Sequence, residues 1–176
     1  MKSKLAFTSV ISAFALLGVA AAQTGSGTMG VTATVQGSIN LTFVTDVSGL
    51  AVTGTTTNVA SLPFGTVQFY GGTTPANVTK TVNGVTSFAL ATPFDVRVDL
   101  ANSTSTTYTL AATLSAADAI NTWLLGAINI SSGTSTTLTA AGAYAMAVPY
   151  TLNLTVPASG GPGLISNTMN FTATGN

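Results

Sequence analysis

The residues best suited to chemistry in this sequence are few, and three of them lie on one short segment. Asp95, Arg97 and Asp99 alternate with apolar residues, so their side chains would share one face of an extended chain. Two carboxylates at this spacing could contribute to a calcium site, but such a site needs about six or more oxygen ligands, usually from a loop. An ion pair on the solvated face of a strand is the simpler interpretation, and we expect no metal site here.

The composition offers little else for catalysis. The sequence has no His and no Cys, and its four acidic residues are Asp46, Asp95, Asp99 and Asp118. General acid–base catalysis and nucleophile activation usually depend on His, Cys or Glu. We therefore expect no enzyme, with no catalytic residues, no cofactor and no small-molecule substrate.

Four aromatic residues form a second candidate site. Trp123, Tyr70, Tyr108 and Tyr144 could together stack against a sugar. In a small β-protein, such residues more often belong to the core and keep only their polar tips near the surface, and we favour that interpretation.

The first 22 residues have the pattern of an export signal. Lys2 and Lys4 precede an apolar run over residues 5–19, and small residues follow at positions 20–22. A transmembrane anchor is the alternative, but it needs about 20 apolar residues, and this run is shorter and interrupted by serine. We expect a Sec-type signal peptide over residues 1–22, cleavage near Ala22, and a mature chain located outside the cell, at its surface or in a fimbrium.

The rest of the chain is almost uncharged. Its only basic residues are Lys80 and Arg97, and it has four aspartates, which gives a net charge of about −2. No basic patch can neutralise phosphates, so we expect no nucleic-acid partner. Low charge also removes the repulsion that keeps copies of a protein apart, so self-association is favoured.

The elements that must position these residues are mostly strands. Threonine is abundant and strong helix formers are scarce, which favours an all-β fold. Alternating apolar residues predict strands over 38–44, 62–70, 79–90 with a turn at Asn83-Gly84, 94–100, 108–114, 125–130, 144–156 and 165–173. The 94–100 and 108–114 segments should pair as a hairpin, and only 116–125 is helix-like. Pro149 should bend or break its strand, or lie where that strand has an edge.

About seven or eight strands of this length indicate an Ig-like antiparallel β-sandwich, either complete or lacking one strand. No disulfide can stabilise it because there is no Cys, so stability must come from the core or from neighbouring subunits. The expected core consists of Ile39, Leu41, Phe43, Phe64, Val67, Phe94, Val96, Val98, Leu110, Leu152, Leu154, Met169 and Phe171.

The longest alternation begins before the first of these strands. Apolar or small residues occupy every odd position from Met29 to Phe43, which as one strand would be about 50 Å long at roughly 3.3 Å per residue. Such a strand could bend at Gly37 and cross between the sheets of its own sandwich. Alternatively, residues 23–37 form an arm that belongs in another copy of the chain. We prefer the second interpretation because Gly37 alone is too short a turn for the arm to fold back on its own sandwich.

Several of these features resemble secreted pilins of the chaperone–usher type, most closely the spore coat protein U-like branch. The resemblance rests on the signal peptide, the alternating arm, Phe64-Gly65-Thr66 in "LPFGTVQFYGG" and the closing "NTMNFTATGN". It implies a sandwich that lacks one strand and is held by a periplasmic chaperone, with an outer-membrane usher as a second assembly partner. The arm of the next subunit would then fill the groove by β-augmentation. Family members usually carry a cysteine near the position of Ile39, and this sequence does not.

The resemblance also assigns roles to individual residues. The donor side chains would be Met29, Val31, Ala33 and Val35. The first strand and acceptor region would include Ile39, Leu41, Phe43, Met169 and Phe171.

The sequence therefore predicts a signal peptide over 1–22, a candidate donor arm over 23–37 and a sandwich over 38–176. Its function would be that of a structural subunit that polymerises head to tail into a pilus, surface fibre or coat, with copies of itself as partners. A monomeric secreted binding module, such as a glycan-binding or biofilm-matrix protein, is the alternative.

Overall fold

The computed structural model describes residues 28–176, and the chain divides into two units, Met1–Thr34 and Val35–Asn176. Residues 28–34, the described part of the first unit, form no helix or strand. All the strands of the described residues belong to the second unit. The only helical element in residues 28–176 is the short 3-10 turn η1 (Ala158–Gly160), and no helix in that range could cross a membrane.

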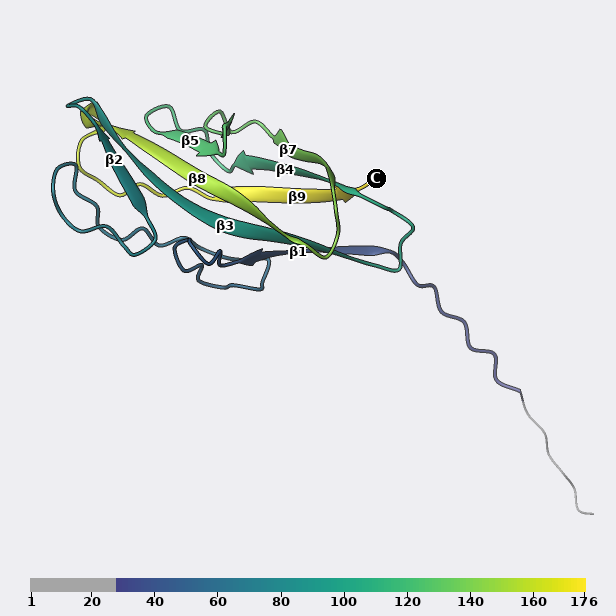
Figure 1. Cartoon of the computed structure of the whole chain (residues 1–176). Coiled ribbons are helices and arrows are strands. Elements are labelled where there is room, and N and C mark those ends of the chain that lie inside the picture. The colour runs from purple at the N-terminus through teal and green to yellow at the C-terminus, as the bar shows by residue number, and fades with distance from the viewer. Residues whose placement is uncertain (1–27) are drawn as a thin grey trace, which may run out of the picture. The chain divides into compact units, whose positions relative to one another are not determined.

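Two antiparallel sheets make up the second unit (Figure 1). The larger has the order β1-β3-β8-β5-β6, with β2 also paired to β3. Its strands are β1 (Ser38–Val44), β2 (Thr79–Asn83), β3 (Ser87–Ala101), β5 (Thr122–Leu125), β6 (Ile128–Asn129) and β8 (Ala147–Pro157). The smaller sheet has the order β7-β4-β9, with β4 (Tyr108–Leu114), β7 (Thr136–Gly142) and β9 (Met169–Gly175). The prediction of an all-β antiparallel sandwich is confirmed.

The strand order matches that of an Ig domain with one position empty. In Ig domains one sheet has the order A-B-E-D, and the facing sheet contains C, F and G side by side. Here β1, β3, β8 and β5 take the A-B-E-D positions, and β4 and β9 take the C and F positions. Within residues 28–176, no strand lies beside β9 where strand G would be. The sandwich is therefore incomplete at this edge.

The core lies between the two sheets. Along almost the whole length of β3 and of β4, buried residues alternate with partly buried ones, so one face of each strand contributes to this core. Six of the expected core residues are buried, namely Phe94, Val96, Val98, Leu110, Leu152 and Leu154. Six others are only partly buried, namely Leu41, Phe43, Phe64, Val67, Met169 and Phe171. Ile39 is 36% exposed, so its prediction as a core residue is wrong. These seven incompletely covered residues line one groove.

Some expected elements are wrong. Residues 62–68 form no strand, since a strand needs a hydrogen-bonded neighbour and the segment has none within the described chain. Residues 116–121 form bends in place of a helix, and residues 122–125 form β5. The 94–100 and 108–114 segments do not pair as a hairpin, because β3 and β4 lie in opposite sheets and face each other across the core.

Pro149 lies within β8, opposite Asp95 of β3. On its other side, β8 pairs with β5 only over residues 152–155, so Pro149 faces an edge, as one of the alternatives predicted. β8 begins at Ala147, later than predicted, because Ala145 has a left-handed φ of 61° that interrupts the extended chain.

Candidate functional site: a groove beside β9

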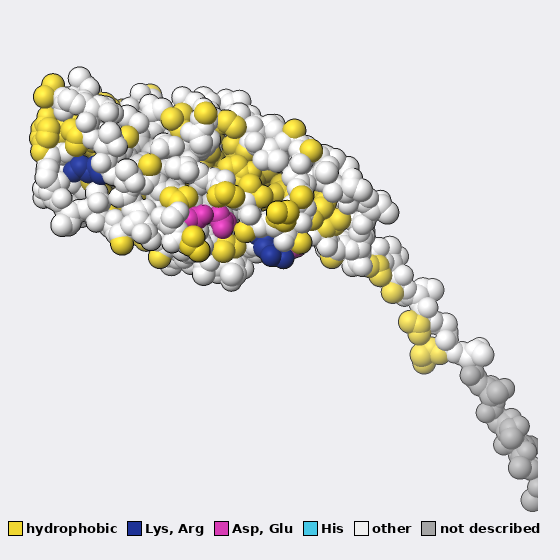
Figure 2. All heavy atoms as spheres, viewed as in Figure 1, with side chains coloured by type: hydrophobic (Ala, Val, Ile, Leu, Met, Phe, Trp, Pro, Cys, Tyr) yellow, Lys and Arg dark blue, Asp and Glu magenta, His cyan; other side chains and the backbone are white. Residues whose placement is uncertain are grey.

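A groove of about 1000 Å³ runs beside the empty strand position. Its lining includes buried apolar residues of the larger sheet, namely Phe88, Leu90, Phe94, Trp123, Leu152, Leu154 and Val156. Part of β1 and residues 58–62 and 64–67 line it as well, and so do residues 163–171. No charged side chain is among the lining residues. In Figure 2, exposed apolar side chains gather over the part of the sandwich where β9 lies.

The structure brings together all the residues that the sequence assigned to the first strand and acceptor region. Ile39, Leu41, Phe43, Met169 and Phe171 all line the groove. β1 also has the predicted bounds, Ser38–Val44.

The sequence analysis did not identify some residues of the groove as candidate site residues. Leu164 and Ile165, in the connection before β9, are 93% and 38% exposed. They lie in a segment whose Gly and Ser content indicates only a loop. Trp123 was weighed as a sugar-stacking residue, yet it lies deep in the groove.

Within residues 28–176, β9 pairs with a strand on one of its edges only. On the β4 side, the Asn176 N–H donates to the Thr107 carbonyl at 2.9 Å, and the Ser115 N–H donates to the Thr168 carbonyl at 2.8 Å. The register between β4 and β9 has no shift, so even-numbered residues of β9 face β4. The backbone groups of its odd-numbered residues therefore face away from β4, toward the empty position.

β1 offers a second, shorter free edge. The Phe43 N–H donates to the Thr57 carbonyl at 2.8 Å, and the Phe43 carbonyl accepts from the Thr56 N–H at 2.6 Å. Phe43 thus faces away from β3, and the alternation of a strand directs the backbones of Leu41 and Ile39 to the same edge. Neither forms a hydrogen bond there with residues 28–176.

Aromatic contacts join the two sheets beside the groove. The rings of Phe43 and Phe171 meet edge to face at a centroid distance of 5.2 Å, and Phe171 meets Phe94 in the same way at 6.0 Å. Such pairs contribute about 0.5–1.5 kcal/mol beyond their burial. They hold β1 and β9 in place although no strand lies between these two edges in residues 28–176.

The residues predicted to be donors are exposed. Met29, Val31 and Val35 are 89%, 83% and 71% exposed, and Ala33 is also exposed. Residues 28–37 form no strand, so the continuous strand that would bend at Gly37 is not seen.

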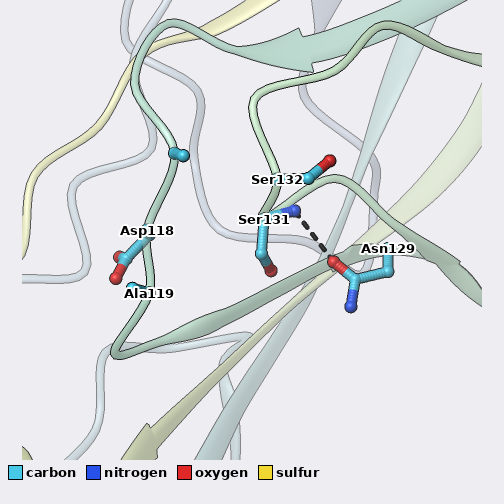
Figure 3. A pocket seen from close by; sticks show the side chains of 6 residues that line it. Asp118, Ala119, Asn129, Ser131 and Ser132 are labelled. Atoms are coloured by element: carbon cyan, nitrogen blue, oxygen red, sulfur yellow. Dashed lines mark hydrogen bonds between the residues drawn. The ribbon is translucent and has the colours of Figure 1, made fainter.

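A second hollow, of about 520 Å³, lies beside Asp118 and is lined by Ala117, Asp118, Ala119, Asn129, Ser131 and Ser132 (Figure 3). The Asp118 carboxylate accepts the indole N–H of Trp123 at 2.7 Å and three N–H groups of Ile120 and Asn121. Burial alone would raise the pKa of Asp118, but these donors lower it to about 2. Asp118 therefore anchors the turn before β5, and its hydrogen-bonding capacity is used within the fold.

Of the remaining charged residues in the described chain, only Arg97 and Asp99 form an ion pair, while the Lys80 ammonium donates to the backbone carbonyls of Gln68 and Gly71. Arg97 and Asp99 make the predicted ion pair at 2.9 Å. Burial, and then the nearby charge of Asp46, raise the pKa of Asp95. Residues 28–176 contain no group of three or more side chains placed to hold a metal ion.

The four aromatic residues do not form one sugar-stacking patch. Tyr108 and Trp123 are 0% and 6% exposed and belong to the core, as we favoured. The rings of Tyr144 and Tyr108 lie 5.3 Å apart, whereas Tyr70 is 60% exposed.

The fold and the groove together define the class of protein as an incomplete Ig-like β-sandwich with a free strand edge beside an uncharged apolar groove. Comparison of the chain with protein-family models, curated proteins and solved structures finds no match.

Proposed function

We propose that this protein is an exported structural subunit that polymerises by strand exchange into a pilus, surface fibre or coat. In this proposal, residues Met29–Val35 of one copy enter the groove of another copy and take the empty position beside β9. Because the arm and the groove are formed by different segments of one chain, each copy can give an arm and receive one, and head-to-tail contacts that do not close into a ring generate filaments.

The observation that carries the proposal is the groove itself. It lies where an Ig domain would have its last strand, and the odd-numbered residues of β9 direct unpaired backbone groups toward it. A strand edge of this kind is a template for pairing with another chain. Its apolar lining, without charge, suits an occupant that presents apolar side chains on one face.

The arm has these properties. Its apolar side chains at positions 29, 31, 33 and 35 share one face of an extended chain, and the whole segment 23–37 is uncharged. Burying four such side chains is worth about 5–8 kcal/mol, at roughly 1.5–2 kcal/mol each, before the backbone hydrogen bonds are counted.

Export and assembly factors belong to the same proposal. A Sec-type signal peptide over residues 1–22, which lies outside the described residues, would deliver the chain across the membrane. A free edge and an apolar groove would aggregate if left uncovered, so a periplasmic chaperone and an outer-membrane usher are fitting partners.

A secreted monomeric binding module is the second candidate. The groove volume of about 1000 Å³ is at the upper end of the range for small-molecule sites. On this reading an apolar ligand, and not a second copy, would occupy the groove.

A pair of variants in the arm tests the proposal. Val31→Asp places a charge on the face that would enter the groove, whereas Thr32→Asp places the same charge on the opposite face. We expect the processed chain and Thr32→Asp to form filaments, visible by electron microscopy and as ladders on gels of unboiled samples, and Val31→Asp to remain monomeric. Monomers for all three chains, or filaments for all three, would contradict the proposal, and monomers throughout would favour the binding module.

A further inference from the structure

The segment Leu62–Val67 behaves as a strand that lacks a partner. Its sequence predicts a strand, and its apolar residues Leu62, Phe64 and Val67 are partly buried while the residues between them are exposed. Two residues, Gly65 and Thr66, lie between the inward-facing Phe64 and Val67, where a regular strand would have only one. This extra residue marks a bulge, and Gly65 has the left-handed φ, 65°, that such a bulge requires. The segment is thus shaped like a bulged strand, yet it pairs with no other segment in residues 28–176.

The segment lies along the groove. Residues 58–62 and 64–67 line it together with residues 163–171. Ser61 is bridged to Thr53, with the Ser61 N–H donating to the Thr53 carbonyl at 2.9 Å, and Thr53 does not line the groove. Because successive residues of an extended chain direct their backbone groups to opposite edges, Leu62 and Phe64 face away from Thr53.

Pro63 fits this direction. It has no N–H, and by the same alternation its backbone faces the Thr53 side. The missing donor therefore leaves no gap on the edge that Leu62 and Phe64 present.

We propose that Leu62–Val67 is a latent strand that pairs with the arm of a second copy when that arm enters the groove. This inference rests on the proposed function and adds a second partner strand to it. An inserted strand has two edges, and β9 would pair with only one of them. The free edge of β1 offers the other edge only Ile39 and Leu41, because the Phe43 backbone is already bonded to Thr56 and Thr57. Beyond these two residues, the second edge would keep unpaired backbone groups in an apolar groove, which is costly unless a neighbour satisfies them. Leu62–Val67 supplies that neighbour, so insertion orders two strands at once.

Amide hydrogen exchange on the full processed chain tests the proposal. Monomer and polymer are separated by size, and exchange is measured residue by residue. We expect the Leu62 and Phe64 amides to exchange rapidly in the monomer and at least about tenfold more slowly in the polymer, because a ladder hydrogen bond must open before exchange. The odd-numbered amides of β9 report insertion itself.

The outcomes separate the two proposals. Protection of β9 without protection of Leu62 and Phe64 would overturn the latent strand and leave strand exchange standing. Failure to form any polymer would overturn both.

Engineered cysteines give an independent measurement, since the chain has no native thiol. Val67→Cys is combined in turn with Met29→Cys, Val31→Cys, Ala33→Cys or Val35→Cys in the full processed chain. Directly opposed residues of paired strands have Cβ atoms about 4.5–5.5 Å apart, close to the separation that a disulfide requires. We expect at least one combination to give disulfide-linked oligomers on oxidation of the polymer.

Val85→Cys serves as the matched control for Val67→Cys, because Val85 is 76% exposed in the β2–β3 turn and does not line the groove. Polymers that form normally but yield no cross-link with any Val67 combination, or equal cross-linking with Val85→Cys, would overturn the latent strand.

Discussion

At the scale of single residues, Asp118 shows how an isolated charge stabilises a chain that has few charges. Its carboxylate accepts hydrogen bonds from N–H groups of Ile120, Asn121 and the Trp123 indole, which take the place of water. It thereby fixes both the turn before β5 and the orientation of the tryptophan that lines the groove.

This arrangement predicts an acid-sensitive contribution to stability. The pKa of about 2 in the folded chain lies below the ordinary aspartate value of 3.8, so the contribution is fully present above about pH 4 and is lost as the pH falls toward 2. Asp118→Asn should lower the free energy of unfolding at pH 7 by about 1 kcal/mol and flatten the pH dependence between about pH 4 and pH 2. Urea unfolding checks this, with Asp118→Asn introduced into the Val31→Asp chain, which we expect to be monomeric. Asp99→Asn in the same chain is the control, because the Arg97–Asp99 ion pair is exposed and should contribute little to stability. An unchanged pH profile for Asp118→Asn would contradict the assignment.

Residue patterns also limited what the sequence could predict. The Thr92 hydroxyl is fully buried, accepts the Leu50 N–H at 2.7 Å and donates to the Asn77 carbonyl at 3.0 Å. It ties two irregular segments to β3, and Leu50, Val52 and Val78 of these segments join the core. No periodic pattern marks such residues, because their burial depends on a contact between distant parts of the chain.

At the scale of elements, period-two alternation located most strands but not their partners. It gave the bounds of β1 and β4 correctly, because apolar residues alternate along both strands. In β4 the alternation separates buried from partly buried residues, whereas β1 has no buried residue. It also predicted a strand over 62–70, where alternation is real but no neighbouring backbone is present in the described chain. Alternation of apolar residues indicates which side chains of a segment face inward. It does not indicate whether another backbone lies beside the segment to form strand hydrogen bonds.

Close packing between elements gives a prediction for β7. Gly142 lies directly over the Tyr108 ring, and a Cβ atom there would overlap the ring carbons. Tyr108 is 0% exposed, so its ring has no space to move. Gly142→Ala should therefore lower the free energy of unfolding by about 2–3 kcal/mol, within the range for overpacked cores. Gly163→Ala is the control, since a Cβ atom there meets nothing within 4 Å, and similar losses for both variants would contradict the packing argument.

At the scale of the whole molecule, the residues that line the groove share a sequence pattern with residues of the core. Leu41, Phe43, Met169 and Phe171, predicted as acceptor residues, carry the same apolar alternation as core residues, and the structure leaves them partly uncovered. The groove volume and its rim at 163–168 could not be predicted, because they depend on how two sheets and two irregular segments lie around an empty strand position. Sequence periodicity shows that a residue faces inward, whereas only the fold shows whether anything covers it.

The distribution of charge over the molecule leads to a prediction about assembly kinetics. Neither the groove nor residues 23–37 contain a charged side chain, so association should depend on apolar burial and backbone pairing alone. We expect the rate of filament formation to change less than about twofold between about 10 mM and 500 mM sodium chloride, a range over which screening would strongly slow a charge-steered encounter. Sodium sulfate should accelerate it, since excluded salts strengthen apolar burial. Thr32→Asp, which adds one charge to the arm, provides the comparison in light-scattering measurements. A steep loss of rate with sodium chloride for the unmodified chain would show that charged surfaces outside the groove, around Lys80 or Arg97, direct the contact between copies.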